Sequence, residues 1–118
     1  MSLAEYLQAW RGFDWRTANC AHFAIGWAKP QALDGVQMPG AAIELRHVLR
    51  VLGFKALRYW VSSELGAPIA ATMAQPGDVV LVGRSLGLSD GRWLWVPMTD
   101  GALAVMPMAW ASCAWRKL

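Results

Sequence analysis

The hydrophobic pattern of this chain changes once, near Pro68, and that change limits the folds open to it. Before Pro68, apolar residues recur at the spacing of amphipathic helices. After Pro68, they stand in short runs separated by turn residues, which is the pattern of antiparallel strands. The sequence therefore predicts an α+β fold, with N-terminal helices packed on a small C-terminal antiparallel sheet.

The first two helices have clear start signals. Ser2 and Glu5 have the spacing of a capping box, which predicts a helix that ends near Trp10. Thr17 or Asn19 can cap a second helix that closes before Pro30. One face of that helix carries four apolar residues at helical spacing: Cys20, Phe23, Ala24 and Trp27.

The middle of the chain is predicted less sharply. Residues 30–40 read as a loop, and residues 41–52 have the apolar spacing of a third helix that ends before Gly53. Residues 55–65 carry both an alternating and a helical pattern, and we favour a short helix over a strand.

The C-terminal part reads as a small meander. A turn at residues 75–78 leads into an apolar run at residues 79–82. Asp-Gly pairs at 90–91 and 100–101 are typical of hairpin turns. The further strands are expected at 86–88, 93–96 and 103–106.

Composition indicates one domain over residues 1–118 with an unusual excess of tryptophan. The 118 residues include 8 Trp but only 16% charged residues, whereas typical domains have about 25%. Because Trp is enriched at the centres of protein interfaces, the excess suggests a surface that packs against a partner. The candidates, for which a place in the core is the alternative, are Trp93, Trp95, Met98, Met106, Met108 and Trp110.

Several classes of partner are disfavoured. The net charge of +3 forms no basic block, which argues against nucleic acid. The longest charge-free stretch, Gly101 to Trp115, is too short to span a bilayer and contains Pro107. No secretory signal is visible, so we expect synthesis in the cytoplasm. In that reducing compartment Cys20 and Cys113 are expected as free thiols, and no cofactor or metal is expected.

Cys20 is the residue that most invites a mechanism. A thiol in the first turn of a helix meets the positive end of the helix dipole, which favours the thiolate and makes Cys20 a candidate nucleophile. The alternative is that Cys20 is a small apolar residue of the core. His22 lies two residues away and should point elsewhere, and His47 falls on the polar face of the third predicted helix.

The order of these features resembles the NlpC-like, papain-fold cysteine peptidases. It is closer still to the small NlpC-like proteins encoded in tail modules of tailed phages and prophages. The resemblance runs from about Trp15 to the end of the chain. It rests on four segments in order: Asn19-Cys20 with Phe23 and Trp27, then residues 76–81, residues 86–88 and Ala114-Trp115-Arg116.

The resemblance implies a papain-like fold with Cys20 as the nucleophile, and it implies that the general base is missing. The catalytic histidine of the family opens the strand after the Gly77-Asp78 turn, and Ser85 stands at that position here. Serine does not act as a general base near neutral pH. The catalytic pair is therefore expected to be broken, with Cys20 vestigial.

We accordingly expect a non-enzymatic component of the phage or prophage virion, placed at the tail tip or baseplate. Its expected partners are other tail or baseplate proteins, bound through the Trp- and Met-rich surface, with contact to peptidoglycan a further possibility. One alternative is an active peptidase or amidase that cleaves peptidoglycan during infection, with His47 or His22 recruited as base. The other is a small binding module or enzyme inhibitor.

Overall fold

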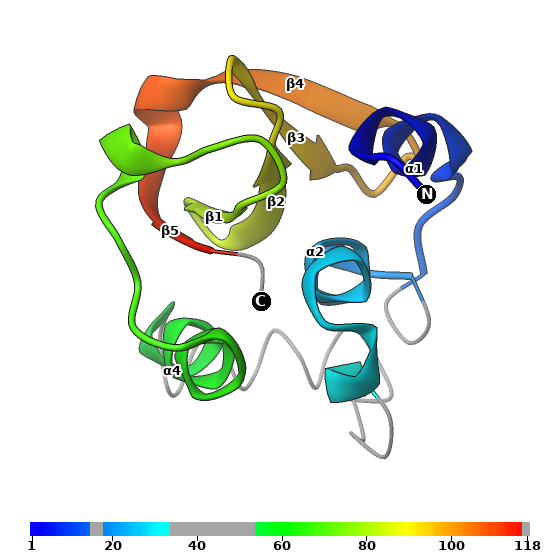
Figure 1. Ribbon diagram of the computed structural model, residues 1–118. Helices are drawn as coiled ribbons and strands as arrows, with labels where there is room; N and C mark the ends of the chain where they lie inside the picture. The colour runs from blue at the N-terminus through cyan, green and yellow to red at the C-terminus, as the bar shows by residue number, and fades with distance from the viewer. Residues whose placement is uncertain (15–17, 34–53, 117–118) are drawn as a thin grey trace.

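The structure, a computed structural model, describes residues 1–14, 18–33 and 54–116 (Figure 1). The predicted helix over 41–52 and His47 lie outside these ranges. Within them the fold is α+β, with helices in the N-terminal half followed by a five-stranded antiparallel sheet. The predicted fold class is confirmed.

The helices begin where the sequence signals place them. Helix α1 spans Leu3–Ala9, and the capping box between Ser2 and Glu5 is present. Helix α2 spans Cys20–Ala28 with Asn19, and not Thr17, as its cap. A short 3₁₀ segment, η1 (Pro30–Leu33), follows it.

The ambiguous segment after Gly53 is helical. Helix α4 spans Phe54–Leu65, so the helical pattern prevailed over the alternating one. Val61 and Leu65 are buried in the core, while Tyr59 faces solvent. An amphipathic helix lets this segment bury one side and satisfy its own backbone hydrogen bonds, which a strand without a neighbouring strand cannot do.

The sheet confirms the predicted meander and adds a strand that was not predicted. Strands β1 (Val79–Val82), β2 (Ser85–Ser89), β3 (Trp93–Pro97) and β4 (Leu103–Pro107) follow one another as hairpins. Two further 3₁₀ segments, η2 (Ala71–Met73) and η3 (Met108–Trp110), precede β1 and β5 in the chain. Strand β5 (Ala111–Trp115) pairs with β1 and completes the sheet. The order is β4-β3-β2-β1-β5.

Each face of the sheet has its own apolar cluster. Val79, Leu81 and Leu88 face the larger cluster, which the helices cover. Val80, Leu94 and Ala114 face a smaller one on the other side. Successive side chains of a strand point to opposite faces, so β1 contributes Val79 and Leu81 to one cluster and Val80 to the other, and reads as a continuous apolar run. Figure 1 shows α1 beside β3 and β4, with α2 next to the sheet.

Gly87 permits the close contact of β2 with β3. A Cβ atom at Gly87 would lie 2.6 Å from the carbonyl oxygen of Trp95. Since that separation is shorter than van der Waals contact allows, any side chain at this position would push the two strands apart.

The Trp- and Met-rich set divides between core and surface. Trp95 packs against the larger cluster, and Met106 and Met108 pack against the smaller one. The other three are exposed: Trp93, Met98 and Trp110. Trp115, at the end of β5, is completely buried.

Candidate functional site

The candidate site lies where the first residue of α2 meets the start of β2. Cys20 opens α2, is partly buried, and packs against the larger cluster. The backbone of Leu86, the second residue of β2, forms a hydrogen bond to the Cys20 sulfur. The residue next to Leu86 in the chain is Ser85, the position at which the resemblance places a catalytic histidine.

Asn19 holds the start of α2 in place. Its side-chain oxygen accepts hydrogen bonds from the backbone N–H of Ala21 at 2.9 Å and of His22 at 3.1 Å. The Asn19 side chain is buried, so the cap is made inside the protein and fixes the position of the following cysteine.

The thiol is less acidic than the sequence predicted. Burial raises the pKa of Cys20, and this effect exceeds that of the backbone hydrogen bonds from Leu86, Cys20 and Ala21, which act to lower it. The prediction that a helix N-terminus would favour the thiolate is therefore wrong here. The physical reason is that the helix begins against the sheet, where desolvation of a charged sulfur outweighs the nearby N–H groups.

His22 is turned toward the cap. The backbone N–H of Asn19 donates to His22 Nδ1 at 3.3 Å, so the imidazole completes a capping box. Burial lowers the pKa of His22, opposed by the negative charge of Asp14. A ring nitrogen that accepts a hydrogen bond must be unprotonated. Nδ1 of His22 already accepts one from the Asn19 N–H in the helix cap. The prediction that His22 does not face Cys20 agrees with this geometry.

Cys113 lies in β5, opposite Leu81 in β1, and is buried. Both cysteines are free thiols, as predicted. Burial raises the pKa of Cys113, while the positive charge of Arg58 acts in the opposite direction. Among the described residues, no group of three or more His, Cys, Asp or Glu side chains is arranged to hold a metal ion.

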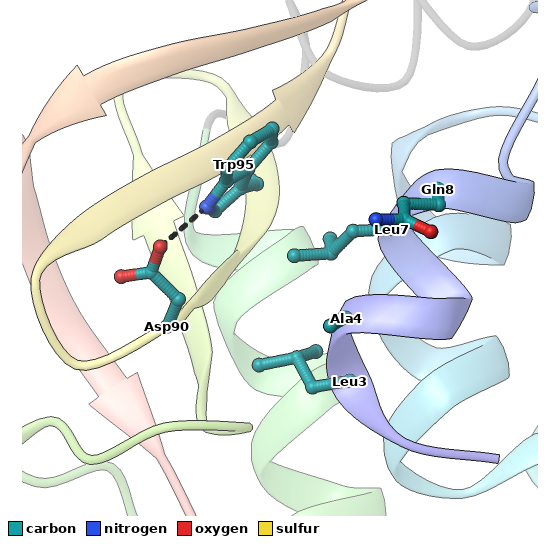
Figure 2. A pocket seen from close by; sticks show the side chains of 6 residues that line it. All are labelled: Leu3, Ala4, Leu7, Gln8, Asp90 and Trp95. Carbon is teal, nitrogen blue, oxygen red and sulfur yellow. Dashed lines mark hydrogen bonds between the residues drawn. The ribbon is translucent and has the colours of Figure 1, made fainter.

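A concave feature lies between α1 and β3, and no sequence motif indicated it beyond the Asp90-Gly91 turn. This groove of about 440 Å³ is lined by Leu3, Ala4, Leu7, Gln8, Asp90 and Trp95. Figure 2 shows Trp95 and Asp90, joined by a hydrogen bond, on one side of the groove. The side chains of α1 lie on the other side.

Asp90 is fixed by three donors. Its Oδ2 accepts from Trp95 Nε1 at 2.8 Å, and its Oδ1 accepts from the backbone N–H of Arg92 at 2.8 Å and of Trp93 at 2.6 Å. Burial acts to raise the pKa of Asp90, but these hydrogen bonds and the charge of Arg92 lower it. The carboxylate therefore closes the hairpin turn and orients the indole, and its acceptor capacity is largely used.

No helix in the described ranges is long and apolar enough to cross a membrane.

Comparisons with known proteins identify a family. Neither the curated proteins nor the solved structures include a match to this chain. Residues 1–117 match the family described as "Domain of unknown function (DUF6950)". Since the match covers nearly the whole chain, the protein belongs to the DUF6950 family.

Proposed function

We propose that this protein is a non-enzymatic structural component of a phage or prophage tail, at the tail tip or baseplate, built on a degenerate NlpC-like fold. The observation that carries the non-enzymatic part is the arrangement around Cys20. The thiol has a raised pKa, and the nearest histidine in sequence, His22, is bound into the helix cap. The tail location rests on the resemblance of the motifs described above.

A cysteine hydrolase needs a thiolate and a base that shuttles the proton. Serine at position 85 supplies neither a base nor a positive charge. Loss of one member of a catalytic unit lowers the rate by orders of magnitude, so a chain with this site is better suited to assembly than to hydrolysis. The exposed side chains of Trp93 and Trp110 provide apolar surface for tail or baseplate partners.

The location is tested in virions. We expect the protein to co-purify with intact tails of the phage or induced prophage that encodes it, and to copurify with the neighbouring tail proteins when they are expressed together. Its absence from purified tails, together with failure to bind any neighbouring tail protein, would overturn the proposal.

The active hydrolase is the second candidate, and one observation favours it. Cys20 opens a helix and contacts the backbone of β2, the position that a nucleophile of such a fold would occupy. Purified protein is incubated with peptidoglycan, and released peptides and amino sugars are measured beside Cys20→Ala and His47→Ala. Release that requires both residues would establish the hydrolase and reject the non-enzymatic role.

A further inference from the structure

The outer edge of β4 is an open sheet edge. The strand order places β4 at one end of the sheet and β5 at the other. The edge of β5 is covered at Ala114, where Ile69 pairs with it through reciprocal backbone hydrogen bonds of 2.7 and 3.0 Å. Within the described ranges, no segment pairs with β4 on the side away from β3.

The register identifies which backbone groups point outward. The N–H of Met98 donates to the carbonyl of Ala102 at 2.8 Å, next to the hairpin turn. Hydrogen-bonded and non-hydrogen-bonded pairs alternate along an antiparallel ladder, and β3 and β4 pair without a bulge. Ala104 therefore bonds to β3, whereas the N–H and C=O groups of Leu103 and Val105 point away from the sheet.

This edge has none of the usual protection. Natural edge strands commonly carry charges, bulges or central prolines that prevent pairing with other chains. Strand β4 has no charged residue, and its only proline, Pro107, is its last residue. The side chain of Val105 is 48% exposed, and Trp93, which lies opposite Pro107 on the same face, is 41% exposed.

We infer that β4 pairs antiparallel with β4 of a second copy of this chain, which joins the two sheets into one continuous sheet around a twofold axis. A twofold axis places each residue near its own copy, so any charge close to the axis would meet a like charge. The uncharged strand avoids this repulsion. The inference concerns self-association and does not depend on the proposed tail function.

The charge of Asp100 favours the antiparallel arrangement over a parallel one. Arg92 precedes β3 and Asp100 lies in the turn before β4, at opposite ends of the hairpin. In an antiparallel pair of β4 strands, the Asp100 end of one copy lies toward the Arg92 end of the other, where Asp90 and Arg92 offset each other's charge. A parallel pair would instead bring the two Asp100 carboxylates together, and like charges that face each other across an interface disfavour that orientation.

The test uses the full-length protein and sedimentation velocity over a wide range of concentrations. We expect a concentration-dependent species of twice the monomer mass. Val105→Pro removes the outward N–H while leaving the hydrogen bonds to β3, because proline is tolerated where an edge N–H faces solvent. The dimer should be lost in this variant and in Val105→Lys, and retained in Val105→Thr, which keeps the N–H and the β-branched shape.

Two controls keep the result interpretable. Circular dichroism and the urea midpoint establish that each variant is folded, and Tyr59→Lys places a charge on exposed α4, so its dimer should match that of the wild type. A wild-type protein that remains monomeric at every concentration, or a dimer that persists in folded Val105→Pro, would overturn the inference.

Discussion

His22 Nδ1 accepts a hydrogen bond from the backbone N–H of Asn19 at 3.3 Å, and this contact makes the imidazole part of the helix cap. The same two residues bond in the other direction, since the Asn19 side chain accepts from the His22 N–H. A reciprocal cap of this kind requires the neutral imidazole.

We therefore expect the stability of the protein to fall in mild acid. The pKa of His22 in the folded protein is lowered from 6.5, so between the two pKa values the unfolded chain binds more protons. The contribution of His22 is complete above about pH 6.5 and is lost as the pH falls through the folded pKa. Urea unfolding between pH 7 and pH 5 should show a flatter profile in His22→Gln, which retains a capping side chain that does not titrate. In contrast, Asn19→Ala should cost about 1 kcal/mol at every pH. An unchanged pH profile in His22→Gln would contradict this role.

The Cys20 thiol is expected to remain protonated at neutral pH. Burial raises its pKa, so alkylation by iodoacetamide should be slow and should accelerate only in alkaline solution. The rate is measured in Cys113→Ala, in which Cys20 is the remaining cysteine. Rapid alkylation at pH 7 would instead reveal an activated thiolate and would support the hydrolase.

Ser85→His tests how far the site is from a working catalytic pair. The introduced imidazole begins one residue from the backbone group that contacts the Cys20 sulfur. We expect an imidazolium there to lower the pKa of the thiol and to raise its alkylation rate at neutral pH at least about tenfold, corresponding to about one pKa unit. Ser85→Gln is the uncharged control. Equal rates in both variants would show that position 85 does not reach the thiol.

The buried carboxylate of Asp78 is expected to stabilise the turn before β1. Its Oδ2 accepts from the backbone N–H of Gln75 at 2.8 Å and lies 3.4 Å from Arg116 Nε. Asp78→Ala removes the buried, charged acceptor of the Gln75 N–H and should cost about 2 kcal/mol of unfolding free energy. Arg116→Ala, at an exposed side chain, should cost less than about 1 kcal/mol. Equal losses in the two variants would mean that the ion pair, and not the turn, carries the effect.

Local signals account for much of what was predicted correctly. The Ser2 and Asn19 caps, the helical face of α2 and the two Asp-Gly turns depend on residues a few positions apart, and each appears where it was expected. Strand β5 was missed because its residues carry no adjacent turn pair and its partner, β1, lies far away in the chain. Pairing of that kind depends on the sheet already being formed.

The ionisation of Cys20 likewise depends on both local sequence and tertiary structure. Sequence by itself determined that the thiol opens a capped helix and that no histidine follows His47 in the chain. Only the tertiary structure decided that the helix begins against β2, where desolvation raises the pKa of the thiol, and that His22 bonds back to Asn19. Capping depends on neighbours along the chain, whereas burial depends on segments brought together by folding, and here burial is the larger effect.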